Sequence, residues 1–153
     1  VEPYLGTAGS VAPYLLTGAV DRGETEIALD ILGRLRGAGF HPLQVMVMLH
    51  RHYQRILRLD DPDVGGEAEA VAALGGKVKP YPASLALRQS RVLRTAGIRA
   101  AYEALAKADL DLRGATAAPE DATLEVLVAR LAGISRRAGA GGARRPTGSR
   151  SRR

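Results

Sequence analysis

Two apolar patterns with helical spacing flank a turn at residues 37–42. Apolar positions three and four residues apart share one face of an α-helix. The two sets are Ile27, Ala28, Ile31, Leu32 and Leu35 before the turn, and Leu43, Met46, Val47, His50, Tyr53 and Leu57 after it. Gly37 and Gly39 favour the end of the first helix, and Pro42 suits the first turn of the next. The pattern therefore predicts a helical hairpin.

Glycine, proline and acidic turns divide the rest of the chain into further helical segments. Besides the hairpin, the predicted helices cover residues 11–20, 67–74, 83–95, 97–114 and 119–135. Residues 79–82 are expected to form an extended link, because each proline disfavours helix in the residue before it. No segment alternates at period two. The sequence therefore predicts an all-α fold, a compact helical bundle of about five to six helices.

The chain is predicted to have one domain with an appendage at each end. Residues 11–135 form the bundle, and residues 1–10 are a linker or a remnant of a preceding domain. Residues 136–153 lack an apolar period and are predicted to be a disordered Arg-rich tail. Seven arginines lie there, so of 22 basic residues 22 − 7 = 15 remain against 16 acidic ones, and the bundle is about neutral. A basic tail attracts phosphate, but a solvated, disordered end is the favoured interpretation.

The second helix of the hairpin carries more apolar residues than one stripe can hold. The residues off its main stripe are Val45, Met48, Leu49, Ile56 and Leu59. A helix that is apolar nearly all round must be buried, and a small bundle has few central positions. We therefore expect these five residues to form an interface with a partner chain.

Few residues suit catalysis. His50 and His52 are two positions apart, so they point to different sides of a helix, and His41 is placed to cap one. Asp109 falls on an apolar stripe and is either a general base or half of a structural ion pair with Arg113, which we favour. The chain has no cysteine and no glycine-rich phosphate loop. We therefore predict no catalytic residue, no cofactor and no metal.

One basic face is a candidate contact for DNA or an acidic partner. Its residues are Lys79, Tyr81, Arg88, Arg91 and Arg94. Arginine and lysine at helical spacing suit phosphates, and a tyrosine suits stacking on a base. A solvated face is an equally good interpretation. This face and the tail support an alternative function, that of a small helical nucleic-acid-binding protein.

Three segments, in order, resemble one family. They are Gly23–Pro42, with the sequence Gly-Glu-Thr-Glu-Ile-Ala-Leu-Asp-Ile-Leu at its start, His50–Leu59, and Lys79–Gly114, which ends in Ala-Asp-Leu-Asp-Leu-Arg-Gly. Together with the closing Leu-rich helix they resemble the C-terminal region of the δ subunit of bacterial DNA polymerase III, part of the clamp loader. Arg113 stands where the family commonly has lysine, which keeps the charge.

The resemblance implies a collar-type helical domain with no catalytic activity of its own, within a holoenzyme that is a DNA-directed DNA polymerase. It implies partners in δ′ and τ/γ, in a five-subunit ring of the bacterial cytoplasm. The sliding clamp would be contacted only through an N-terminal domain that this chain lacks, and residues 1–10 would be a remnant of the lid domain. The function expected from the resemblance is subunit assembly for clamp loading in DNA replication.

Overall fold

The computed structural model describes residues 11–143, which fold into six α-helices and one π-helical turn. The elements are α2 (Pro13–Asp21), α3 (Thr25–Gly37), α4 (Pro42–Arg58), α5 (Glu67–Ala73), α6 (Pro80–Leu110), η1 (Asp111–Ala115) and α7 (Glu120–Ala143). Within this range there is no strand, and the predicted all-α fold is confirmed. The proposed lid remnant at residues 1–10, and the tail from residue 144 onward, lie outside the described residues.

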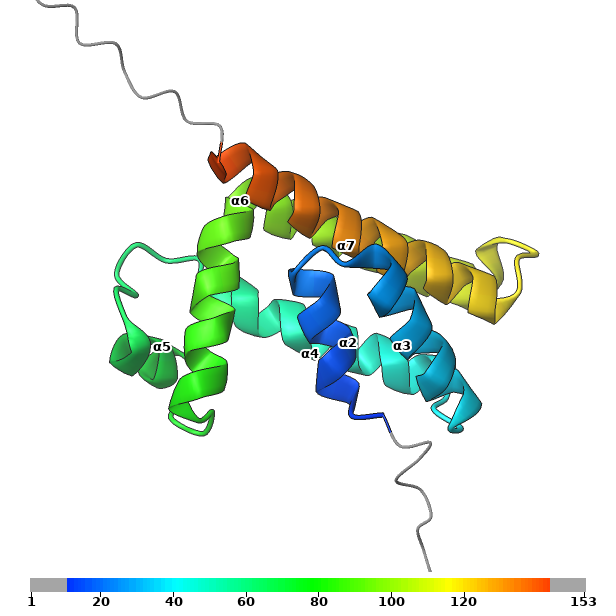
Figure 1. The fold of residues 1–153 in the computed structure, drawn as a ribbon, viewed down its shortest axis with the longest axis horizontal. Coiled ribbons are helices and arrows are strands. Elements are labelled where there is room, and N and C mark those ends of the chain that lie inside the picture. The colour runs from blue at the N-terminus through cyan, green and yellow to red at the C-terminus, as the bar shows by residue number, and fades with distance from the viewer. Residues whose placement is uncertain (1–10, 144–153) are drawn as a thin grey trace, which may run out of the picture.

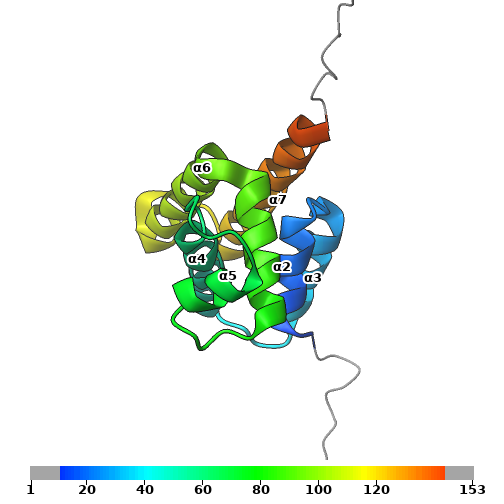
Figure 2. The ribbon, with the colours of Figure 1, turned by 90° about the vertical axis from the view of Figure 1, so that its left-hand side faces the viewer.

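The helices pack as a hairpin of long helices with shorter ones beneath it. α6 and α7 lie side by side, and α2 and α3 pack against α7 (Figure 1). α4 crosses the molecule (Figure 1) and packs on α6, whereas α5 packs on the first half of α6, at the end of the molecule that faces the viewer in Figure 2. No helix in the described part of the chain is long and apolar enough to cross a membrane.

Apolar side chains form two cores of unequal size. The main core contains the fully buried Leu16, Leu35, Leu49, Leu105 and Leu131. A smaller core under α5 is made by Leu59, Val64, Ala70, Leu74, Ala83 and Ala86. The many buried alanines allow helix axes to approach closely. Close approach is needed because few aromatic side chains are present to fill wider gaps in the core.

α6 begins earlier than the sequence predicts. Its first turn is Pro80–Pro82, which was expected to be an extended link. Proline is tolerated there because the first turn has no intrahelical partner for its N–H groups. The predicted break near residues 95–97 is present as a sharp bend at Arg94, which has φ 57° and ψ 177°. A non-glycine residue in this region of φ/ψ space is strained.

α7 continues to Ala143, past the domain boundary predicted at residue 135. Arg136 and Arg137 are therefore helical, and the disorder predicted for 136–143 is wrong. Tertiary packing outweighs the weak helix propensity of this segment. Ala138 packs against the main core, and the turn at Gly23 lies directly on Arg136.

The turn between α2 and α3 requires glycine at position 23. Gly23 has φ +71°, and a Cβ atom there would lie 2.7 Å from Cβ of Arg136 and 2.9 Å from its Cα. Positive φ is strained for residues with a Cβ, and the obstructing atoms include α7 backbone. The close approach of this turn therefore fixes α2 and α3 against α7.

We predict that Gly23→Ala destabilises the protein by about 1–3 kcal/mol or more, because the new methyl group meets backbone that cannot move alone. Gly33→Ala is the matched control. Gly33 lies inside α3, and apart from the adjacent helix backbone no atom lies within 4 Å of the position that a methyl group would take there, so alanine should stabilise by about 0.5–1 kcal/mol. Urea unfolding measures both changes, and a neutral Gly23→Ala would contradict the close approach.

Candidate interaction surfaces

The sequence prediction assigned the wrong face of α4 to a partner. Val45, Leu49, Ile56 and Leu59 are at most 1 % exposed within this chain, and Met48 is partly buried. These residues pack inside the domain instead of forming an outer interface. The exposed apolar residues of α4 are Leu43 (61 %), Val47 (48 %) and Leu57 (47 %), which were assigned to the inner stripe.

The error has a geometric cause. The buried stripe is centred on Val45, Leu49 and Ile56, roughly a quarter turn around the helix from the predicted one, at 3.6 residues per turn. Both stripes contain Met46 and Tyr53, which are buried. When two overlapping stripes are both apolar, periodicity does not decide between them.

An apolar groove runs between α2 and α4, along most of the length of α4. Its volume is about 560 Å³. The lining residues are Pro13, Tyr14 and Thr17 of α2 with Leu43, Gln44, Val47, Met48, Arg51, His52 and Arg55 of α4. Tyr14 is 72 % exposed, so the groove presents aromatic and aliphatic surface, with arginines at one end.

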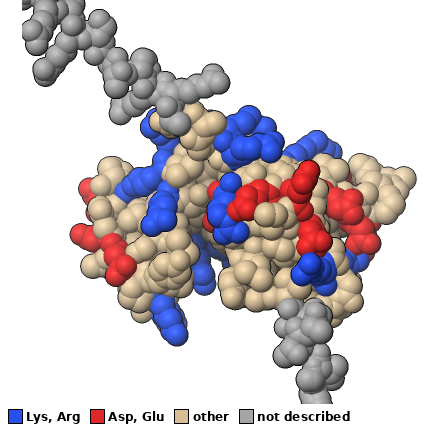
Figure 3. All heavy atoms as spheres, in the orientation of Figure 1, with Lys and Arg blue, Asp and Glu red and all other residues tan. Residues whose placement is uncertain are grey.

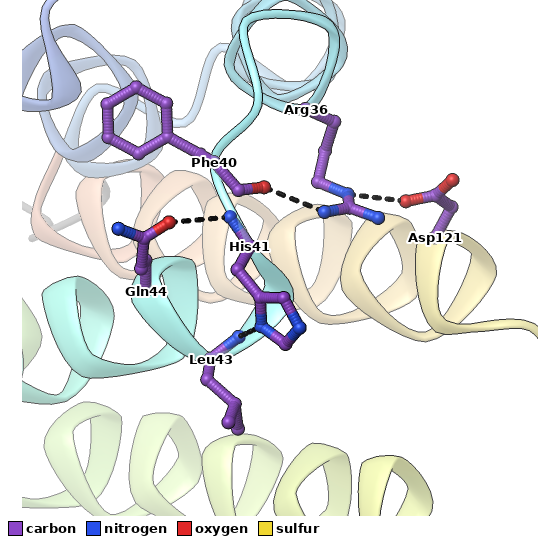
Figure 4. Close-up of polar contacts among 6 residues, drawn as sticks. All are labelled: Arg36, Phe40, His41, Leu43, Gln44 and Asp121. Atoms are coloured by element: carbon purple, nitrogen blue, oxygen red, sulfur yellow. Dashed lines mark hydrogen bonds and ion pairs between the residues drawn. The ribbon is translucent and has the colours of Figure 1, made fainter.

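The start of α4 is fixed by a cap at His41. The backbone N–H of Leu43 donates to Nδ1 of His41 at 3.2 Å, and the N–H of His41 donates to Oε1 of Gln44 at 2.7 Å (Figure 4). These bonds satisfy N–H groups that a helix start otherwise leaves unpaired. The capping role expected for His41 is confirmed, and the cap holds Leu43 at the rim of the groove.

The hairpin turn is also tied to α7. Arg36 donates to Oδ1 of Asp121 at 2.6 Å and to the carbonyl oxygen of Phe40 at 2.7 Å (Figure 4). Charge-assisted bonds of this kind are among the stronger ones in proteins. The residues before α4 are therefore held against the start of α7, which limits movement of the groove wall.

Beneath the groove, polar side chains link four helices. Nε2 of His52 lies 2.8 Å from Oδ1 of Asp21, joining α4 to α2. Gln89 of α6 donates to Oγ of Ser135 in α7 at 3.1 Å. Burial raises the pKa of the Tyr53 phenol above its usual value, and the Asp21 carboxylate adds to the increase. The ring therefore remains neutral.

Asp109 does not make the ion pair predicted for it. Its Oδ2 lies 3.1 Å from Nε2 of His50, and among residues 11–143 it has no ion pair with Arg113. The cause is η1: a π-helical turn begins at Asp111 and changes the register that would place Arg113 one α-turn beyond Asp109. Asp109 still has a structural partner, on α4 instead of its own helix.

On the predicted basic face, some side chains are engaged in bonds within the domain and others are free to bind a ligand. Arg91 donates to the carbonyl oxygens of Leu59 and Asp61 at 3.2 Å each and to that of Val64. It therefore holds the loop that follows α4. The side chains of Arg88 and Arg94 make no hydrogen bond or ion pair within the described range.

The other residues of this face occupy different places. Tyr81 is 72 % exposed and lines a groove with Arg88. Lys79 is the N-cap residue of α6 and does not line that groove. Arg22 and Arg136 also line it. Arg136 belongs to the basic tail predicted from the sequence, whereas no sequence signal pointed to Arg22. Figure 3 shows basic side chains along the first half of α6, and acidic ones over α3 and the start of α7.

The described residues form an all-α helical domain with an apolar groove and a basic groove on its surface. Residues 11–143 hold no group of three or more His, Asp or Glu side chains placed for a metal ion. The family model described as DNA polymerase III delta subunit, C-terminal domain, matches residues 13–131. The chain therefore belongs to that family, which confirms the resemblance of the three segments, and is a clamp-loader component. No curated protein and no solved structure matches the chain.

We predict that Arg91→Ala destabilises the domain by about 1.5–3 kcal/mol, the range for hydrogen bonds to a charged group, because three carbonyl oxygens lose their donor. Arg88→Ala, one helical turn earlier, should change the free energy of unfolding by less than about 0.5 kcal/mol. Thermal or urea unfolding measures both. If the two substitutions lowered the free energy of unfolding equally, Arg91 would have no structural role that Arg88 lacks, which would contradict the prediction.

We also predict a loss of stability above about pH 10, the usual pKa of tyrosine. Because the folded-state pKa of Tyr53 is raised, its stabilising effect is complete below that pH and decreases as pH rises, when the unfolded chain ionises first. A tyrosine with a raised folded-state pKa lowers the free energy of unfolding by up to about 1.4 kcal/mol per pH unit in this range. Tyr53→Phe should flatten the alkaline decline. Tyr14→Phe, at an exposed position, should leave it unchanged in the same pH-dependent unfolding series.

Proposed function

We propose that this domain is a non-catalytic assembly module, which joins the δ subunit to neighbouring clamp-loader subunits by helix packing so that the sliding clamp is loaded onto DNA. Membership of the δ family supports the clamp-loader setting. The observation that carries the proposal is the apolar groove between α2 and α4. The partners proposed are the δ′ and τ/γ subunits, in the bacterial cytoplasm where replication takes place.

The groove has the character of a protein interface. Tyr14, Leu43 and Val47 are about half to three-quarters exposed and line one concave surface. Aromatic and large aliphatic residues clustered in this way mark interaction surfaces, whereas single exposed residues such as Val126 are ordinary. Burial of such residues supplies most of the free energy of an interface.

The occupant proposed is an amphipathic helix of a neighbouring subunit. A helix lays its apolar face into a groove of this kind through residues at positions i, i+3, i+4 and i+7. Arg51 and Arg55 line one end of the groove, so a helix with carboxylates at that end would match the charge. Such pairs would set orientation more than affinity.

We expect the double substitution Leu43→Glu and Val47→Glu to weaken association with the neighbouring subunits by at least about 100-fold, which corresponds to about 2.7 kcal/mol. Two buried carboxylates without partners are costly in an apolar interface. Tyr14→Ala should weaken association by about 5- to 30-fold, as for an interface aromatic worth 1–2 kcal/mol. Analytical ultracentrifugation with purified δ′ and τ/γ measures these changes.

Leu57→Glu is the matched control, because Leu57 lies on the same helix with nearly the same exposure as Val47 but does not line the groove. It should leave association intact. Association driven by apolar burial should also persist at high salt, unlike phosphate binding. Unchanged assembly in the Leu43/Val47 variant, with the helical circular dichroism spectrum intact, would show that the groove is not the subunit contact.

A further inference from the structure

A second groove lies between the first half of α6 and the C-terminal end of α7. Tyr81, Leu85, Arg88 and Val92 line one wall, at helical spacings of four, three and four residues. This spacing places them in one row over about 16 Å of helix, at 1.5 Å per residue. The facing wall is formed by α7 and α2, and the volume is about 600 Å³. Its residues are Ser135, Arg136, Gly139 and Ala140 of α7 with Gly18 and Asp21 of α2 and Arg22 just after it.

The groove continues past the bend in α6. A second hollow of about 590 Å³ is lined by Arg88, Val92 and Gly139, which it shares with the first, and by Arg94 beyond them. Gly139, Gly141 and Gly142 have open space where a side chain would be, so an approaching ligand meets bare helix backbone there. The two hollows therefore form one trough along α6.

The trough is positively charged. Arg88, Arg94 and Arg136 line it, and none of them pairs with a carboxylate among residues 11–143. Asp21 also lines it, but His52 lies against that carboxylate at 2.8 Å. Acidic side chains gather over α3 and the start of α7, and also at the end of the molecule where α5 lies (Figure 3). A trough of this kind attracts a chain of negative charges.

An exposed aromatic ring stands at one end of the row of arginines. Tyr81 is 72 % exposed, and Leu85, one turn further, is 40 % exposed. Pro80 and Pro82 on either side of Tyr81 restrict the backbone, so the ring is presented from a stiff helical turn. Aromatic side chains beside a basic groove bind single-stranded nucleic acid by stacking on its bases.

We propose that this trough, defined by Tyr81, Leu85, Arg88, Arg94 and Arg136, binds single-stranded nucleic acid without sequence preference. The arginines contact successive phosphates, and a base stacks on Tyr81. A duplex would hide the base faces that Tyr81 needs, and an acidic peptide would engage the arginines without using the ring. The proposal does not rest on the proposed assembly function, because the trough and the α2–α4 groove share no residue.

The test is the affinity of the whole chain for a labelled 20-mer of oligothymidylate, measured by fluorescence anisotropy at several salt concentrations. Tyr81→Ala should weaken binding about 5- to 150-fold, the range for loss of one stacked base, and Tyr81→Phe should bind as the parent chain does. Arg88→Ala should lower the slope of log affinity against log salt by about 0.7, for one lost phosphate contact to a single strand.

Tyr14→Ala is the matched control, because Tyr14 is exposed to the same extent as Tyr81 but lines the other groove. It should leave oligonucleotide binding unchanged and weaken only subunit association, and Tyr81→Ala should do the reverse. Arg34→Ala, which removes a surface arginine paired with Asp30, controls for net charge. This pattern would support nucleic-acid binding by the trough, whatever the outcome of the assembly test.

Three results would overturn the proposal. The first is equal affinity of all variants, because the arginines at positions 144–153 are present in each and would then account for the binding. The second is duplex DNA bound as tightly as the single strand. The third is binding of a labelled oligoglutamate peptide that Arg88→Ala weakens, combined with oligothymidylate binding that Tyr81→Ala leaves unchanged, because the trough would then be a protein contact.

Discussion

Burial of one face of α4 is the interaction on which the structure depends. Val45, Leu49, Tyr53 and Ile56 belong to the main core, and Leu59 belongs to the smaller core under α5. α4 therefore contributes to the main core, and its C-cap residue Leu59 extends this packing into the smaller one, whereas α6 contributes to both. Large buried side chains of this kind typically contribute 2–5 kcal/mol each when truncation to alanine is measured. Because the inward face is fixed, Leu43 and Val47 must lie on the opposite side of the helix, where they line the α2–α4 groove.

Periodicity in the sequence was sufficient for the helices and for their order. It did not determine which face of α4 is buried, since that depends on helices distant in sequence. Nor did it separate Arg88 from Arg91: both belong to one run with a spacing of three, and only the path of the loop after α4 brings carbonyl oxygens to Arg91. The ends of helices were missed where tertiary packing supports a segment of weak propensity, as in α7 beyond Ser135.

Polar side chains in this domain position the helices more than they supply chemistry. His41 caps α4, and Arg36 ties the hairpin turn to α7. His52 and His50, two positions apart on α4, contact Asp21 of α2 and Asp109 of α6 respectively. Each of these residue types occurs in active sites, but here His41 caps its own helix and the others pair with a neighbouring one. His50 and His52, with their carboxylate partners, therefore hold α4 against α6 and α2.

The absence of cysteine from the chain allows the face of α4 to be mapped by single cysteines. The decisive measurement is the alkylation rate of Val47→Cys, Leu49→Cys and Leu57→Cys, with and without the neighbouring clamp-loader subunits. The account predicts that position 47 reacts rapidly alone and is protected by the partners, that position 49 is protected in both states, and that position 57 reacts in both. Rapid alkylation at position 49 in the chain alone, or no protection of position 47 by the partners, would contradict it.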